Sequence, residues 1–267
     1  MVSFSPEWLD RREPADRLAH SPRVLGAVAR HFLGRDALQI CDLGAGTGAT
    51  LRAVREHLPR HQDWVLVDYD DTNLAAAETR LAPVLEAHPR VSVQMHQADL
   101  SDNFAPWPET TELVTASALF DLTAPDWIYR FVSGLEGRPL LALLTYDGRL
   151  RFSRFAPEDG VMAEAFNNHQ QTDKGFGPAA GPQAAAILRE ALEAAGYEVL
   201  VGDSTWHLGE GFRAMRKDIM DGWAVAADQM GVRDDVIERW QKAHADPRDQ
   251  LLVGHTDLWA VPQPASA

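Results

Sequence analysis

Short apolar runs alternate along this chain with longer stretches whose apolar residues recur at helical spacing. The runs that favour strands are Leu38–Leu43, Trp64–Asp68, Val91–Gln97, Leu113–Ser117, Leu140–Thr145, Val199–Val201 and Leu251–Ala260. Helical spacing between them predicts helices at Gly48–His57, Thr72–Ala87, Asp126–Val132 and Gln183–Ala195. Strands that alternate with helices are typical of βαβ units, so we expect an α/β fold with helices on both faces of a largely parallel sheet.

Three segments lie outside this regular alternation. Residues 1–36 and 209–248 have helical spacing, at Pro14–Ala19, Val24–Leu33, Phe212–Met230 and Val232–Ala245. Residues 147–182 form a long connection after the fifth strand. Long inserts usually serve as lids or binding loops. No linker separates a second domain, so we expect one domain over residues 1–267, made of a helical cap (1–36), a core sheet (37–208), a helical insert (209–248), and a final strand and tail (249–267).

Charge and composition narrow the class of partner. The 267 residues are 45% hydrophobic and 24% charged, which is typical of a globular protein, and the formal net charge is −14. Such an acidic surface repels phosphate backbones and anionic lipid, so we expect neither nucleic acid nor membrane as a partner. No apolar run approaches the roughly 20 residues of a membrane span, and no signal peptide is visible, so we expect a cytoplasmic protein. The one cysteine, Cys41, lies in an apolar strand and is interpreted as a buried structural thiol.

The most informative stretch is a glycine-rich turn after the first predicted strand. Glycines at 44, 46 and 48 follow the strand and precede a helix. Glycine lets the backbone turn sharply and lets a ligand approach closely, and the helix N-terminus directs free N–H groups at that ligand. The pattern predicts a nucleotide-type cofactor site. Gly44-x-Gly46-x-x-Ala49 also satisfies a loose dinucleotide fingerprint, and Asp68 would suit NAD, so an NAD-dependent oxidoreductase is an alternative.

Acidic residues close each of the first three predicted strands. Asp42, Asp68 and Asp99 would form a row along the carboxyl edge of the sheet, where open α/β sheets bind ligands. A carboxylate at position 42 would repel a pyrophosphate but tolerate a cationic ligand. The chain also lacks the Tyr-x-x-x-Lys pair of many short dehydrogenases. These observations favour a cofactor other than NAD.

At these residues the chain resembles the class I S-adenosylmethionine-dependent methyltransferases. Asp42–Gly48 looks like the family's glycine motif, Val65–Tyr69 like its acidic second strand, Ala98–Leu100 like its adenine-contacting acid, and Leu113–Phe120 like its fourth strand. The resemblance covers about residues 37–145. It implies a Rossmann-like, seven-stranded sheet of order 3-2-1-4-5-7-6 with the last strand antiparallel. It also implies S-adenosylmethionine as methyl donor, S-adenosylhomocysteine as product, and no metal.

The resemblance also implies roles for individual residues. The loop of Gly44, Ala45, Gly46, Thr47 and Gly48 would pass under the methionine part of the donor.

Further residues are assigned by the same resemblance. Asp68 would accept hydrogen bonds from the ribose hydroxyls, Tyr69 would pack on the adenine, and Asp99, beside Leu100, would accept from the adenine amino group. Four residues would bind the amino-acid end of the donor, its ammonium or its carboxylate: Asp42, Ala116, Ser117 and Arg12.

Methyl transfer from a sulfonium is an in-line displacement. The enzyme aligns a nucleophile, excludes water and removes a proton where the nucleophile carries one. Aromatic faces stabilise the sulfonium. We therefore expect the acceptor pocket where the fourth and fifth strands end, under the N-terminal helices and the inserts.

Polar residues near those strand ends are the candidates for chemistry. Asp121, Tyr146 and His169 are the catalytic candidates, although a helix cap, a turn and a surface histidine are their structural alternatives. The candidates for acceptor binding are Asp147, Lys174 and Phe176, the last two in a glycine-rich turn that would close over the site. Trp223 and Trp240 lie on helical stripes and are interpreted as core.

Departures from other methyltransferase patterns narrow the acceptor. Ser117–Phe120 stands where amino-directed nucleic acid and glutamine methyltransferases carry an Asn-Pro-Pro-Tyr sequence, and no metal-dependent catechol pattern is present. The sequence therefore predicts methyl transfer to a small organic acceptor by a monomer or homodimer. A non-catalytic S-adenosylmethionine-binding protein is a further alternative, and the residues do not rank O-, N- or C-methylation.

Overall fold

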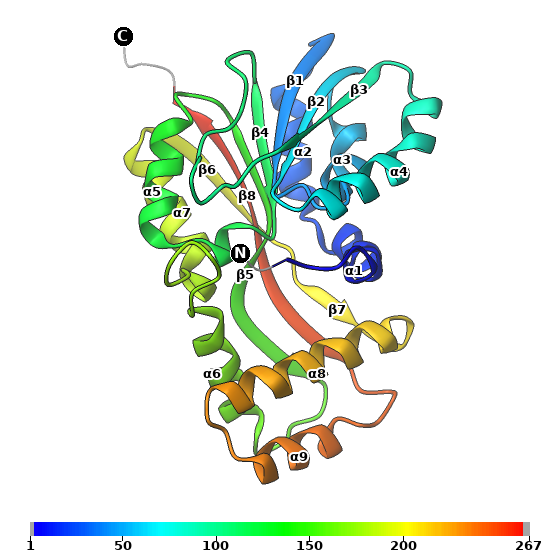
Figure 1. Ribbon diagram of the computed structural model, residues 1–267, viewed down its shortest axis with the longest axis vertical. Coiled ribbons are helices and arrows are strands. Elements are labelled where there is room, and N and C mark those ends of the chain that lie inside the picture. The colour runs from blue at the N-terminus through cyan, green and yellow to red at the C-terminus, as the bar shows by residue number, and fades with distance from the viewer. Residues whose placement is uncertain (1–2, 264–267) are drawn as a thin grey trace.

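One twisted sheet organises the structure, a computed structural model that describes residues 3–263 (Figure 1). Its strands are β1 (Ala37–Leu43), β2 (His61–Asp68), β3 (Val91–Gln97), β4 (Leu113–Ser117), β5 (Leu140–Phe152), β6 (Tyr197–Asp203), β7 (Trp206–Leu208) and β8 (Leu251–Pro262). The order is β3-β2-β1-β4-β5-β8-β6, and β8 runs antiparallel to both β5 and β6. The predicted order and the antiparallel last strand are confirmed. The short strand β7, which pairs with β8, was not predicted, and residues 264–267 of the predicted tail lie outside the described residues.

Helices cover both faces of the sheet, as predicted. One face carries α2 (Pro22–His31), α3 (Ala49–Val54) and α4 (Asp71–Ala87), and the other carries α5 (Pro125–Gly134) and α7 (Ala184–Ala194). The central strands β1 and β4 are buried between these layers over Ile40–Leu43 and Leu113–Ala116, as expected for parallel strands covered on both faces. Cys41 is one of these buried residues, and burial raises the pKa of its thiol.

Strands β5 and β8 continue well past the rest of the sheet (Figure 1). Both pass through register irregularities and pair again, with Phe152 opposite Leu251. This end of the ribbon, together with β7 and the helices α6 (Asp159–Gln170), α8 (Arg213–Gln229) and α9 (Asp234–Ala243), forms what we call the distal lobe. Its buried side chains, among them Trp223 and Trp240, form a hydrophobic cluster distinct from the two that cover the sheet.

The distal lobe corrects the expectation for residues 147–182. The structure gives them the end of β5 and the helix α6 rather than a long connection. The polar run Asp147-Gly148-Arg149 interrupts the apolar pattern, although Leu150 and Phe152 beyond it point into the lobe.

The first helix, α1 (Pro6–Ala19), begins eight residues before the predicted start at Pro14. The Ser5 side chain accepts a hydrogen bond from the Trp8 backbone N–H, and Pro6 occupies the first turn, where its missing N–H costs nothing. Pro14 lies inside the helix instead of starting it. The longer helix reaches the carboxyl edge of the sheet and brings Arg12 there.

We expect Gly48→Ala to destabilise the fold by about 1–3 kcal/mol, because position 48 holds a left-handed conformation in a crowded place. Its φ is +77°, and an added Cβ would lie 2.9 Å from Leu81 Cδ1. Urea unfolding followed by circular dichroism measures the change. Gly160→Ala in α6 is the matched control, since nothing lies within 4 Å of its added Cβ. Equal unfolding midpoints for Gly48→Ala and the unaltered protein would contradict the expectation.

Candidate functional site

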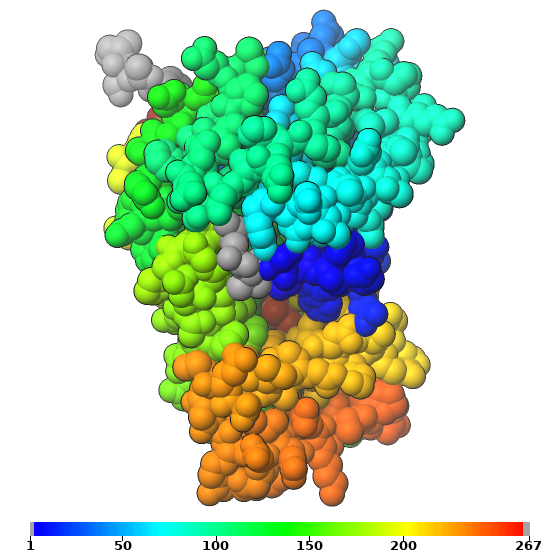
Figure 2. Space-filling view, viewed as in Figure 1, coloured from blue at the N-terminus to red at the C-terminus, as the bar shows by residue number. Residues whose placement is uncertain are grey.

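Two cavities lie side by side where the parallel strands end. The edge cavity, of about 120 Å³, is bordered by the glycine turn after β1, the end of β2 and the N-terminal segment. The lobe cavity, of about 460 Å³, lies between α1, the 3-10 turn Phe120–Leu122 after β4, and the distal lobe. Figure 2 shows a hollow between α1 and α8 with part of β8 visible at its bottom. The residues that line both cavities are Phe4, Arg12, Ala118, Leu122 and Lys174.

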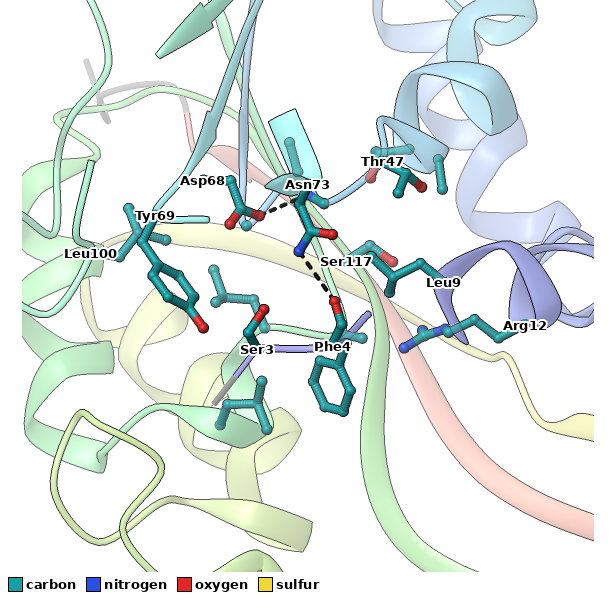
Figure 3. Close-up of a pocket in the computed structure, with 18 of the residues that line it drawn as sticks. Ser3, Phe4, Leu9, Arg12, Thr47, Asp68, Tyr69, Asn73, Leu100 and Ser117 are labelled. Carbon is teal, nitrogen blue, oxygen red and sulfur yellow. Dashed lines mark hydrogen bonds between the residues drawn. The ribbon is translucent and has the colours of Figure 1, made fainter. Parts of the chain in front are cut away.

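Residues at the end of β2 accept hydrogen bonds from the glycine turn and fix its shape. Gly44 and Gly46 both have positive φ, 61° and 53°, and the Ala45 N–H donates to the Val67 carbonyl at 3.0 Å. Asp68 Oδ2 accepts from the Gly46 N–H at 2.8 Å, and Oδ1 accepts from the Asp70 N–H at 3.0 Å. Burial raises the pKa of the Asp68 carboxyl. The end of β2 therefore shapes the turn, and the same residue faces the edge cavity (Figure 3).

Asp42 lies behind the turn. It is fully buried, and its Oδ1 accepts from Thr115 Oγ1 at 2.6 Å while its Oδ2 has no partner among the described residues. Burial raises its pKa to about 7. Asp42 does not line the edge cavity, and neither do Gly48 or Ala116, whereas Ser117 does.

Asp99 departs from its expected position. It is exposed, and its Oδ1 accepts from the backbone N–H and the hydroxyl of Ser101, at 2.8 and 2.7 Å. Asp99 does not line the edge cavity, whereas the neighbouring Leu100 does. Tyr69 and Thr47 line the cavity as expected.

The N-terminal segment crosses the open side of the edge cavity (Figure 3). The Phe4 carbonyl accepts from Asn73 Nδ2 at 3.3 Å, and Ser3 Oγ donates to Asp70. Ser3, Phe4, Leu9 and Asn73 all line this cavity. No motif marks these residues, so sequence reasoning had no signal by which to find them.

Arg12 stands between the two cavities and is held in place by its own helix. Its Nε donates to Asp16 Oδ2 at 2.8 Å, and its Cζ lies 5.2 Å from the ring centroid of Trp206. Trp206 Nε1 donates to the other Asp16 oxygen at 2.9 Å. Burial raises the pKa of Asp16, and Arg12 opposes that shift. The charge of Arg12 is thus largely balanced within the protein.

Asp121 is the buried carboxyl of the lobe cavity. It belongs to the 3-10 turn after β4, is 7% exposed, and its Oδ1 has no hydrogen-bond partner among the described residues. Burial raises its pKa to about 6. A carboxyl with a free oxygen in such a cavity is suited to accept a proton from a bound molecule.

The other two catalytic candidates also line the lobe cavity, but each is engaged. The Tyr146 hydroxyl donates to Asn167 Oδ1 at 2.7 Å, and burial raises its pKa. His169 Nε2 donates to Gln229 Oε1 at 2.9 Å, which leaves Nδ1 without a partner among the described residues. Burial lowers the pKa of His169, so its ring is neutral at pH 7.

The glycine-rich turn brings Lys174 to both cavities. Asp173 Oδ1 accepts from the backbone N–H groups of Gly175 and Gly177, at 2.7 and 3.0 Å, and this folds the turn inward. Lys174 is 7% exposed, and its Nζ donates to the His169 carbonyl and to Thr172 Oγ1, both at 3.0 Å.

Of the other two acceptor-binding candidates, Phe176 lines a cavity and Asp147 does not. Phe176 lines the edge cavity and packs against Trp127, with ring centroids 5.5 Å apart. Asp147 lines neither cavity, because its carboxylate pairs with Arg149 at 2.6 Å on the outer side of the β5–β8 ribbon. The expectation that Asp147 binds the acceptor is not supported by this position.

The wall of the lobe cavity includes residues that sequence reasoning did not assign to a site. His255 of β8 packs on Trp206 with ring centroids 4.5 Å apart, and burial lowers its pKa to about 3, so it is neutral. Trp8 and Phe166 also line the cavity, and Trp223, interpreted above as core, does so as well.

Two further findings concern metals and membranes. Within residues 3–263, no group of three or more His, Cys, Asp or Glu side chains is placed to hold a metal ion. Among the helices in this part of the chain, none combines the length and the apolar character needed to cross a bilayer.

Comparisons with known proteins place the fold. Residues 40–135 match the family model described as "Methyltransferase domain". The YcgJ protein of Bacillus subtilis is 12% identical over 91% of this chain and 99% of that one, with a TM-score of 0.52. A putative methyltransferase from Bacillus halodurans is 15% identical over 90% of this chain and 99% of that one, with a TM-score of 0.50. At these identities the likeness shows a shared fold. No curated protein matches the sequence.

Proposed function

We propose that this chain is a class I S-adenosylmethionine-dependent methyltransferase and that it methylates a small organic acceptor held in the lobe cavity. One observation carries the proposal: the edge cavity and the lobe cavity share Phe4, Arg12, Ala118, Leu122 and Lys174. A donor in the first cavity and an acceptor in the second would therefore meet across these residues. The volume of the lobe cavity, about 460 Å³, falls in the range of roughly 300–1,000 Å³ that small-molecule sites occupy.

The residues around the edge cavity fit the donor. Gly46 has a φ of +53°, and an added Cβ would lie 3.0 Å from Leu9 Cδ1, so a larger residue would strain the turn and push Leu9 aside. We assign Asp68 to the ribose, Tyr69 and Leu100 to the adenine, and Ser117 and Arg12 to the amino-acid end. Asp42, with an orphaned oxygen beneath the turn, would favour a nearby cation. Because the cavity holds only about 120 Å³, we expect donor binding to displace the N-terminal segment at Ser3, which lines the edge cavity and not the lobe cavity.

The donor, when bound, supplies an electrophilic methyl group on a positively charged sulfur. The chain's own residues do the rest. The aromatic walls of the lobe cavity exclude water and fix the acceptor, and Asp121 Oδ1 accepts the proton that the nucleophile releases. We further propose a cytoplasmic monomer or homodimer of one domain that acts without metal, nucleic acid or membrane, a view that the net charge of −14 supports.

Calorimetry with S-adenosylhomocysteine tests the proposal. We expect saturable binding with a dissociation constant in the micromolar range, and no detectable binding at millimolar ligand would contradict the function. Formation of S-adenosylhomocysteine from the donor with a panel of acceptors then separates an enzyme from a protein that only binds the cofactor.

We expect turnover to fall as the pH drops through about 6, because Asp121 accepts a proton only when ionised and its pKa is about 6. The charged and titratable groups that line the cavity around it are Arg12, Tyr146, His169, Lys174, Asp218 and His255. Burial raises the Asp121 pKa above its unfolded value, so protonating this group does not itself destabilise the fold. The measurement is kcat from about pH 5 to pH 8, alongside the melting temperature at each pH. A kcat that stays constant across that range would contradict the assignment of Asp121.

A further inference from the structure

We propose that the acceptor is a planar aromatic compound whose hydroxyl oxygen is the nucleophile, deprotonated by Asp121 and stabilised as an oxyanion by Lys174. This inference rests on the proposed function and names the substrate class of the same site. It selects O-methylation over N- and C-methylation, which the sequence leaves open.

The shape and chemistry of the lobe cavity favour a flat, apolar acceptor. Its wall is rich in aromatic side chains, contributed by the N-terminal segment, α1, β5, α6, β7 and α8: Phe4, Trp8, Tyr146, Phe166, Trp206 and Trp223. Several of these rings pack edge-on or tilted against one another, as Tyr146 with Phe166 and Phe166 with Trp223. Ring edges and faces of this kind bind other aromatic rings well.

Lys174, which lines both cavities, has no negatively charged partner among the described residues. Its Nζ contacts two neutral oxygens, and it forms no ion pair with any described residue. Arg12, the other cation that borders both cavities, is paired with Asp16, as described above. A buried ammonium without a counterion is costly unless a ligand brings negative charge to it. Because Lys174 lines both cavities, that negative charge would lie beside the methyl group to be transferred.

Asp121 supplies a proton acceptor near the place where the two cavities meet, opposite in charge to Lys174. Its orphaned Oδ1 is a proton acceptor, and the next residue, Leu122, lines both cavities. The Ala180 N–H donates to the Thr123 carbonyl at 2.7 Å, which ties the loop after Lys174 to the turn that carries Asp121. A hydroxyl at this point would donate its proton to the carboxylate and leave its charge near the ammonium.

The step balances without a further reactant. The O–H bond breaks and its proton moves to Asp121 Oδ1, and an oxygen lone pair forms the new O–CH3 bond. The C–S bond breaks with its electron pair going to sulfur, which gives S-adenosylhomocysteine and an aryl methyl ether. The proton on Asp121 then passes to solvent.

An amine acceptor fits this arrangement less well. Its nitrogen would gain, next to the Lys174 ammonium, the positive charge that the sulfur loses, whereas an oxyanion becomes neutral there. Like charges close to one another repel more strongly in a buried site than in water.

Three coumarins of one shape test the inference on the full-length protein saturated with S-adenosylhomocysteine: 7-hydroxy-, 7-amino- and 7-methoxy-4-methylcoumarin. The excitation spectrum of the hydroxy compound distinguishes its phenol from its phenolate. We expect the bound hydroxycoumarin to ionise at least one pH unit lower than in solution, a tenfold stabilisation of the phenolate. We also expect the aminocoumarin to bind at least tenfold more weakly than the hydroxycoumarin. The methoxy compound, which cannot ionise, gives the affinity due to ring contacts alone.

Lys174→Gln should abolish the ionisation shift and leave the affinity for S-adenosylhomocysteine within twofold, whereas Lys174→Arg should retain the shift. Lys217→Gln is the matched control, because Lys217 lies exposed on α8 and pairs with Asp221. The inference is overturned if Lys174→Gln keeps the shift, if the amine binds as tightly as the phenol, or if the loaded protein binds no hydroxycoumarin. It is also overturned if Lys174→Gln loses S-adenosylhomocysteine, since Lys174 would then belong to the donor. Failure of the unaltered protein to bind S-adenosylhomocysteine would instead refute the proposed function.

Discussion

Replacement of Asp121 by asparagine is expected to lower kcat by roughly 10²–10⁴-fold, the usual contribution of a positioned general base. Asparagine keeps the shape of the side chain but cannot accept the proton. The affinity for S-adenosylhomocysteine should stay within about twofold, because Asp121 lines the lobe cavity and not the edge cavity. Single-turnover kinetics and calorimetry on the same preparation measure the two quantities.

The control for this experiment is Asp126→Asn. Asp126 is exposed in the first turn of α5, five residues further along the chain, and should change neither quantity. If Asp121→Asn retains kcat within threefold while His169→Ala loses it, the base is His169, whose Nδ1 also has no hydrogen-bond partner among the described residues.

Replacement of Asp68 by alanine should weaken the binding of S-adenosylhomocysteine by about 1–3 kcal/mol, which corresponds to roughly 5–150-fold. Two effects add. The ligand loses a carboxylate acceptor, and the Gly46 and Asp70 N–H groups lose the oxygens that hold the glycine turn. Isothermal titration calorimetry measures the change.

Asp71→Ala supplies the comparison for Asp68→Ala, since Asp71 is exposed at the start of α4 and lines neither cavity. Equal affinity in the Asp68→Ala and Asp71→Ala proteins would refute the role of Asp68 in donor binding. A drop in both would point to the start of α4 rather than to the carboxylate.

The sequence predicts the sheet well because the relevant signals are local. Apolar runs of strand length bounded by glycine and acidic residues identify β1 and β2, and the glycines mark a turn that only glycine adopts easily. The bond between Gly46 and Asp68 follows once β1 and β2 are neighbours, because both residues then lie at the same edge.

The distal lobe could not be predicted in the same way because its signals are non-local. The β5 pattern breaks at Asp147 and resumes only because β8 continues alongside it, which no short window reveals. Trp223 has helical spacing, which says that it is covered but does not distinguish a hydrophobic core from a cavity wall. The placement of Asp99 has a local cause that its position at the end of β3 does not reveal: its Oδ1 accepts from the Ser101 backbone N–H, and Asp99 does not line the edge cavity.

The separate hydrophobic core of the distal lobe bears on how such an enzyme changes its substrate over evolutionary time. Residues of α8 and α9 such as Met215, Ile219 and Trp240 pack with one another and with the start of β8, and not with the clusters that support the glycine turn. Under the proposed function, mutations along α8 would reshape the wall of the lobe cavity while the strands that carry the glycine turn keep their sequence. A laboratory library aimed at new acceptors should vary Ile219, Gly222 and Ala226, which border the lobe cavity, and leave β1 and β2 untouched.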